Sequence, residues 1–207
     1  MEAADAADTI REAAEGGERG AAEQFRRRAA VTIAVLAMLL ALTSLGGANA
    51  TKETTNNNIQ ASDIYAFYQA KTIRQTQYQL AADELRQRLE TAELPPAARA
   101  ATQRRLDDYT ATIARYESEP GRDGQPGQGK RELLAQARDF EARRDRAQRQ
   151  DPNFDYAQAL FQIAIVLGSV SIVATSRRLL LLALALGVVA TVLMLNGYFL
   201  LFALPLG

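Results

Sequence analysis

Residues 29–51, AAVTIAVLAMLLALTSLGGANAT, form a stretch of 23 residues without a charge. Two further charge-free stretches follow, 21 residues at 156–176 and 29 residues at 179–207. A helix of about 20 apolar residues crosses the ~30 Å of membrane hydrocarbon. We therefore predict an all-α integral membrane protein with transmembrane helices at 29–50, 156–176 and 179–204.

Arginines beside these stretches predict the orientation. Arg and Lys that flank membrane spans tend to stay in the cytoplasm. They occur before the first stretch and in the short turn before the third, at Arg26, Arg27, Arg28, Arg177 and Arg178. We expect residues 1–28 to be a cytoplasmic, acidic, Ala-rich tail and residues 52–155 to lie in the periplasm of a bacterial inner membrane. Four arginines before the second stretch oppose this orientation, but long loops follow the rule weakly: Arg143, Arg144, Arg146 and Arg149.

The first stretch also has the features of a signal peptide, because Ala48-Asn49-Ala50 resembles a small-x-small cleavage site. The apolar run exceeds the ~7–15 residues of a signal core. The acidic sequence before Arg26 is also unusual for a signal. We therefore favour an uncleaved span.

The composition excludes several kinds of chemistry. The chain has no Cys and no His, which removes thiol chemistry, Ser-His-Asp catalysis and the commonest metal ligands. The 24 basic and 24 acidic residues cancel, so no net field favours nucleic acid. We expect no catalytic residues, no metal, no cofactor and no nucleic-acid partner.

The polar segment 51–155 is rich in helix-forming residues. Residues 51–58 are poor helix formers and should loosen the exit from the first span. We expect helices from Ser62 to about Glu93, from Pro96 onward, and from Lys130 to about Arg149. A Gly/Pro loop should separate the last two, and Asp151-Pro152-Asn153 should end the third. The result would be an extramembrane helical hairpin or a three-helix stalk with a thin core.

Two motifs have plain explanations. Residues 124–131 nearly match the phosphate-binding pattern G-x-x-x-x-G-K-[ST], but Arg131 replaces the Mg²⁺-binding hydroxyl and no strand precedes the motif. We interpret the segment as a flexible turn. Asp107 and Asp108 are adjacent on a helix and do not face each other, so we interpret them as solvated.

The most distinctive string is Ala61-Ser62-Asp63-Ile64-Tyr65-Ala66-Phe67-Tyr68-Gln69-Ala70-Lys71-Thr72-Ile73-Arg74. Its aromatic density, at Tyr65, Phe67 and Tyr68, favours a membrane interface or a packing surface. Together with Leu45-Gly46-Gly47 and the segment 155–166, this string resembles the bacterial domain-of-unknown-function 4337 membrane protein family. The resemblance covers most of the chain after Arg28. It implies a three-span membrane protein, and it supplies no catalytic residues.

Small residues in the first span recur at spacings of four and three: Ala30, Ala34, Ala37, Ala41, Ser44 and Ala48. Such a seam lets helices approach closely, so we expect it to pack against span two or another subunit. Gly168 and Gly187 lie at equal depth on either side of the turn between spans two and three. We predict that they form a close backbone crossing, and that Gln162 and Asn196 share an interface as an intramembrane polar pair.

These features favour a scaffold or interaction module that works by helix–helix association. We expect contact with membrane lipid and either a homo-oligomer or a membrane-protein partner. The alternative is a small transport or channel subunit forming an oligomeric pore lined by Gln158, Gln162 and Asn196. Against this alternative, the spans contain no charged residue of the kind that ion paths usually have.

Overall fold

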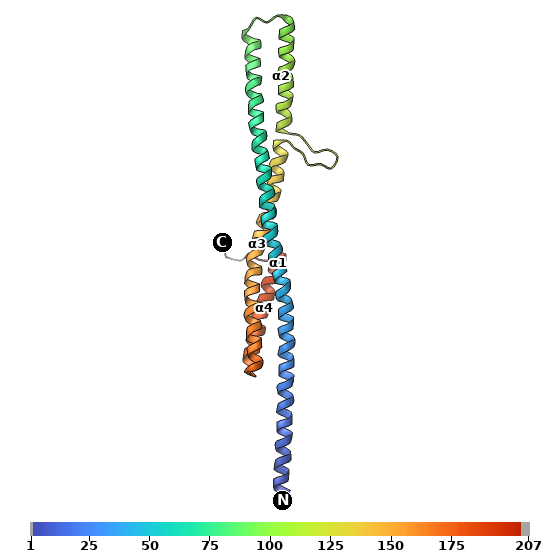
Figure 1. Cartoon of the computed structure of the whole chain (residues 1–207), viewed down its shortest axis with the longest axis vertical. Helices are drawn as coiled ribbons and strands as arrows, with labels where there is room; N and C mark the ends of the chain where they lie inside the picture. Colours follow the sequence, from blue (N-terminus) through green and yellow to red (C-terminus); the bar gives the residue numbers. More distant parts are fainter. Residues whose placement is uncertain (1, 204–207) are drawn as a thin grey trace. The chain divides into compact units, whose positions relative to one another are not determined.

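The protein is described here by a computed structural model that covers the backbone of residues 2–203 and the side chains of residues 20–203. Within this part the chain is all-helical, in the order α1 (Glu2–Thr91), α2 (Pro96–Glu117), α3 (Lys130–Val173) and α4 (Arg177–Phe199) (Figure 1). The predicted cytoplasmic tail falls largely on residues whose side chains lie outside the described part.

Three helices are long and apolar enough to cross a membrane: the Gly20–Thr91 part of α1, together with α3 and α4. This number agrees with the three charge-free stretches. Helix α4, which contains the third predicted span, ends at Phe199, five residues before the expected limit of 204. The helix ends there because Leu200 takes a left-handed conformation with φ of 52°.

The chain divides into two compact units. Unit 1 combines Met1–Lys52 with Ala147–Gly207, and unit 2 is Glu53–Arg146. Helices α1 and α3 therefore each contribute residues to both units.

In unit 2, α1 lies antiparallel to α2 and to the first part of α3 (Figure 1). Tyr78 of α1 contacts Tyr109 and Tyr116 of α2, with ring centroids 5.2 and 5.9 Å away. Arg144 of α3 donates to Asn58 of α1 at 3.3 Å. Within unit 2, α1 is therefore one arm of a hairpin, and α2 followed by the first part of α3 is the other.

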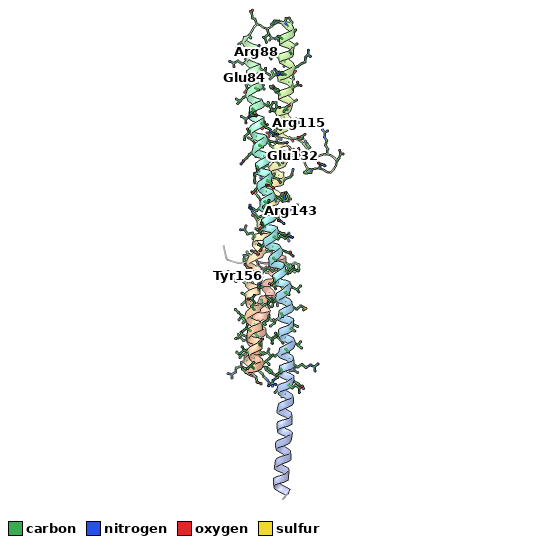
Figure 2. The ribbon with its side chains drawn as sticks, viewed as in Figure 1. Glu84, Arg88, Arg115, Glu132, Arg143 and Tyr156 are labelled. Carbon is green, nitrogen blue, oxygen red and sulfur yellow. The ribbon has the colours of Figure 1, made fainter. Side chains whose placement is uncertain are left out.

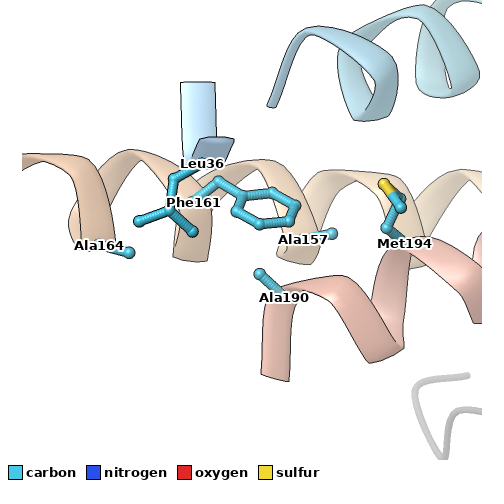
Figure 3. Packing of buried hydrophobic residues seen from close by; sticks show 6 residues of the cluster. All are labelled: Leu36, Ala157, Phe161, Ala164, Ala190 and Met194. Atoms are coloured by element: carbon cyan, nitrogen blue, oxygen red, sulfur yellow. The ribbon is translucent and has the colours of Figure 1, made fainter. Parts of the chain in front are cut away.

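In unit 1, α3 and α4 pack against the first part of α1. Buried apolar side chains from all three helices meet, with Phe161 completely buried at the centre (Figure 3). The members of this core are Leu36, Ala157, Phe161, Ala164, Ala190 and Met194.

Phe154 provides a second centre of packing in unit 1. Its ring lies so close to Gly46 and Gly197 that a Cβ on either glycine would come within 2.6–2.7 Å of it. The ring of Tyr198 meets the same phenyl ring edge-on at 4.9 Å, and its hydroxyl donates to the Leu42 carbonyl at 3.0 Å. Glycines on two helices therefore make the space that this aromatic side chain fills.

Two predicted interruptions are wrong. Residues 51–58 are helical within α1. Their low intrinsic propensity amounts to at most about 0.7 kcal/mol per residue, which tertiary contacts override. One such contact is the hydrogen bond from Thr51 to Asp151 at 3.0 Å.

The predicted break at Asp151-Pro152-Asn153 is also absent, because α3 runs through Pro152 without ending. Proline inside a helix costs about 3 kcal/mol or more, since it removes one backbone hydrogen bond. The next two residues, Asn153 and Phe154, are each only 2% exposed, and the Asn153 amide donates to the Arg149 carbonyl at 3.0 Å. Burial of the following turn holds the helix together across the proline.

Candidate functional site

A cluster of polar side chains lies at the base of the loop between α2 and α3 in unit 2. At its centre is Lys71 of α1, which is 6% exposed. Its ammonium donates to the Gln128 carbonyl, lies 3.7 Å from Glu119, and stands over the rings of Phe67 and Tyr116 at 5.2 and 5.7 Å. The carbonyl, the carboxylate and the two aromatic rings offset the cost of burying this polar side chain.

A second lysine, Lys130, begins α3 beside the first. It donates to Gln75 Oε1 at 2.9 Å and lies 3.6 Å from Glu117. The Gln75 amide in turn donates to the Ile113 carbonyl at 3.2 Å and to Glu117 at 3.3 Å. The hydrogen bond from Gln75 is the largest of several interactions that lower the pKa of Glu117.

Glu132 closes the neck of the loop. One carboxylate oxygen accepts from the Ser118 hydroxyl at 2.6 Å, and the other accepts from the Glu119 backbone N–H at 3.1 Å (Figure 2). The hydrogen bond from Ser118 is the main reason that the pKa of Glu132 lies below its ordinary value. The Gln136 amide adds a bond to the Gly127 carbonyl at 2.7 Å.

This arrangement fastens both ends of the loop. Lys130 is the lysine of the segment that nearly matches the phosphate-binding pattern. Its ammonium bonds Gln75 and pairs with Glu117, so it already has partners within the protein. Sequence reasoning interpreted the segment as a flexible turn and missed Lys71, Gln75 and Glu132. The available signal was the position of Lys71 within the aromatic string, three residues after Tyr68.

The aromatic string is divided between two surroundings. Tyr65 is half-buried, and burial followed by the nearby Glu141 of α3 raises its pKa. Tyr68 is half-buried beneath Lys130, with 5.5 Å between ammonium and ring centroid. Phe67 is 41% exposed. The two tyrosines therefore face the hairpin partner within unit 2.

The small-residue seam of the first span does not face the core of unit 1. Ala30, Ala34, Ala37, Ala41 and Ala48 are exposed, and Ser44 is half-buried. The buried residues instead recur every seven positions, at Ala29, Leu36, Thr43 and Ala50. The seam is thus available on the surface of unit 1, and span two does not cover it.

The predicted crossing of Gly168 with Gly187 is wrong. A Cβ on Gly168 would meet Ile33 at 2.9 Å, and a Cβ on Gly187 would meet Leu36 at 2.5 Å. Each glycine therefore receives a side chain of α1. The two glycines lie at equal depth in their spans, but they do not contact each other. Helices α3 and α4 both turn the face that carries the glycine toward α1.

The predicted amide pair is wrong in one member. Asn196 is fully buried and donates to Asn153 at 2.6 Å, whereas Gln162 is exposed. The Asn196 amide also exchanges two hydrogen bonds with the backbone of Phe202, at 2.9 and 3.0 Å. The partner missed by the sequence analysis, Asn153, lay in the segment assigned to a helix end.

The described residues contain no group of three or more His, Cys, Asp or Glu side chains that could hold a metal ion. The contacts described above fasten helices to each other and to the loop. Together they define a helical protein with three segments that could span a membrane.

The chain belongs to a family described as a domain of unknown function (DUF4337), whose sequence model matches residues 25–200. The match covers both units of the structure from the end of the N-terminal tail to the end of α4. No curated protein and no solved structure matches the chain.

Proposed function

We propose that this protein is a membrane-anchored helical scaffold that works by helix–helix association and carries out no chemistry. The observation that carries the proposal is an apolar stripe on the polar unit 2. It consists of Ile59, Ala66, Ile73 and Leu80, spaced seven residues apart along α1, and we call it the back stripe. Its three large side chains are 50, 61 and 63% exposed.

The back stripe lies on the side of α1 away from its hairpin partners. Gln75, which bonds α2, is two residues after Ile73 and therefore about 200° around the helix. Aliphatic side chains at seven-residue intervals are the pattern of a coiled-coil seam. Their exposure on a charged, polar unit favours a helical partner.

The partner we propose is a second copy of this chain. Two copies anchored in one membrane present α1 in parallel, and the flanking charges suit that direction. In a parallel coiled coil, position g of one helix meets position e of the next heptad of the other helix, five residues on. With the back stripe at position d, Asp83 is at g and would meet Arg88 at e of the other copy, and both residues are exposed.

The seam in unit 1 provides a second contact surface of the same kind. Helices associate in lipid where small residues allow close approach. Its exposed alanines differ from the large side chains exposed elsewhere on the same helix, among them Val31, Val35, Met38, Leu42 and Leu45. We propose that the seam packs against the seam of the second copy.

We further propose that the membrane is a bacterial inner membrane, with the N-terminus in the cytoplasm and residues 52–155 in the periplasm. The support is the arginine distribution: Arg26, Arg27 and Arg28 precede the first span, and Arg177 and Arg178 begin α4. Arginine clusters beside membrane spans tend to stay in the cytoplasm, and this orientation puts both clusters there.

The test is the mass of the purified full-length chain in detergent, against 22.6 kDa for one copy. We expect the wild type to be a multiple of this mass. Replacing both Ile73 and Leu80 with Asp should shift the mass toward the monomer with unchanged helix content. The control is Gln60→Asp with Gln79→Asp, which adds the same charges at exposed positions of α1 that are not at seven-residue intervals from the back stripe. A wild type that is monomeric over the whole concentration range would contradict the proposal.

One observation favours the second candidate, an oligomeric pore. Gln162 is an exposed amide within an apolar stretch, and Gln158 one turn before it is half-buried. An oligomer could place both in a lumen. Solute or ion flux into liposomes containing the purified protein would support the pore. Association without flux would support the scaffold.

A further inference from the structure

A pocket in unit 1 lies beside Pro152, where α3 approaches its charge-free stretch and α4 has just ended. It has a volume of about 390 Å³ and lies between residues 148–153 and residues 200–203. Among the described residues that line it, Arg149 is the only charged one. The side chain of Arg149 is exposed and makes no ion pair within the described part of the chain.

Gln148, which also lines the pocket, has a backbone carbonyl without its usual helical donor. In a continuous helix, the N–H of residue 152 would donate to the carbonyl of residue 148. Pro152 has no N–H, so the Gln148 carbonyl lacks this bond, and both residues line the pocket. A ligand with an O–H or N–H group would satisfy this acceptor.

The rest of the lining is Asn153 together with the apolar residues Leu200, Phe202 and Ala203, and it precedes the charge-free stretch 156–176 of α3. Leu200 and Phe202 line the pocket after the end of α4. Phe202, which lines the pocket, is 44% exposed. Tyr156, four residues after Pro152 on α3, is 47% exposed (Tyr156 is labelled in Figure 2). Aromatic residues of this kind are enriched where membrane headgroups begin.

We propose that this pocket binds a phospholipid whose headgroup carries both a phosphate and a hydrogen-bond donor. The phosphate pairs with Arg149, because guanidinium and phosphate form charge-assisted hydrogen bonds. The donor of the headgroup bonds the Gln148 carbonyl, and the first part of an acyl chain lies against Leu200 and Phe202. Phosphatidylethanolamine and phosphatidylglycerol have this chemistry, whereas phosphatidylcholine has the phosphate without the donor.

The test measures lipid binding to the delipidated full-length protein in detergent, by native mass spectrometry and by the shift in unfolding temperature. The three lipids are compared with the same acyl chains. We expect phosphatidylethanolamine and phosphatidylglycerol to bind about tenfold more tightly than phosphatidylcholine, the change expected from one added hydrogen bond to the carbonyl that lacks its helical donor. Equal binding of all three lipids would overturn the role of the Gln148 carbonyl.

Two variants separate the two contacts. Arg149→Gln should weaken binding of all three lipids about tenfold or more. Pro152→Ala supplies the missing N–H, so it should remove the preference for donor headgroups and leave phosphatidylcholine binding unchanged. The control is Arg146→Gln, which removes the same charge from an exposed residue of α3 that does not line the pocket. If Arg149→Gln and Arg146→Gln behave alike, the site is wrong.

A soluble source of phosphate is tested in parallel. Inorganic phosphate and glycerophosphoethanolamine lack the acyl chains that would contact Leu200 and Phe202. We expect neither to shift the unfolding temperature at concentrations where the lipids do. A shift as large as that with lipid would show a soluble phosphate site and overturn the lipid proposal.

Discussion

Glu132 shows how much one side chain contributes to the polar unit. It is the acidic residue in the first turn of α3, where a negative charge is favoured by the helix dipole. The same carboxylate accepts bonds from Ser118 and from the Glu119 backbone, so it joins the start of one helix to the end of another. Its charge is therefore part of the loop's structure.

We predict that Glu132→Gln loosens the neck of the loop at neutral pH. The pKa of Glu132 is lowered in the folded protein, so its contribution to stability is present above the pKa of the unfolded chain. That contribution disappears as the pH falls through the lowered folded pKa. Urea unfolding at several pH values should show the largest difference in the free energy of unfolding between wild type and variant near pH 7.

The expected difference disappears in the acid range, below the ordinary Glu pKa of about 4.3. Glu84→Gln serves as the control, because Glu84 is an exposed carboxylate on α1 of the same unit (Figure 2). A wild-type-like pH profile for Glu132→Gln would show that the carboxylate does not hold the loop.

The amides of Asn196 and Gln162 should respond differently to replacement by leucine. Asn196→Leu leaves Asn153 and the Phe202 N–H without their partner, so it should destabilise the protein by about 1–3 kcal/mol. Gln162→Leu should leave the unfolding of the single chain unchanged, because Gln162 is exposed. Unfolding in detergent measures both. A larger effect of Gln162→Leu would contradict the observed pairing.

At the scale of the elements, α3 illustrates how packing overrides a local signal. Pro152 alone favours a helix end, and the segment around it has polar residues of the kind that cap helices. The buried turn at Asn153, Phe154 and Ala157 nevertheless belongs to the same helix as Lys130. One continuous helix therefore takes part in both units.

The glycines around Phe154 provide a prediction at this scale. A Cβ on Gly197 would come within 2.7 Å of the Phe154 ring, so Gly197→Ala should destabilise unit 1 by about 1–2 kcal/mol after the gain in helix propensity. Gly46→Ala should behave similarly. The control is Gly20→Ala in α1, where nothing lies within 4 Å of the added Cβ.

Thermal unfolding in detergent is the measurement for these variants. Gly20→Ala should not lower the unfolding temperature, because alanine favours helix and meets no neighbour. If Gly197→Ala and Gly20→Ala have the same unfolding temperature, the close approach of Phe154 to Gly197 is absent from the purified protein.

At the scale of the whole molecule, orientation is the property that the arginines predict. The chain has no cysteine, so a single Cys at Gln125, which is exposed in the loop between α2 and α3, is a clean probe. It should react with a membrane-impermeant thiol reagent on intact spheroplasts. A second variant with Cys at Gln24, exposed just before Arg26, should react only after lysis. The reverse pattern would invert the proposed topology.

The three apolar helices were predictable from sequence because the tendency of a segment to enter a membrane is the sum of the contributions of its own residues. Each charge-free residue adds its own transfer free energy, and three stretches of more than 20 residues need no partner to be recognised. The loop after Glu117 and the start of α2 at Pro96 followed from proline and glycine in the same local way. The resemblance to the family rested on the aromatic string together with Leu45-Gly46-Gly47 and the segment 155–166, and the family match over residues 25–200 confirms it.

Which faces these helices present to one another was decided only by the tertiary structure. Asn196 bonds a residue 43 positions away, and Lys71 bonds one 57 positions away, so no local pattern specifies either pair. The small-residue seam is the clearest case: its spacing predicted a contact face, but the core of unit 1 lies along Ala29, Leu36 and Thr43 instead. Periodicity determines which residues share a face. The rotation of each helix, and hence the face that is buried, depends on all of the helices packed around it.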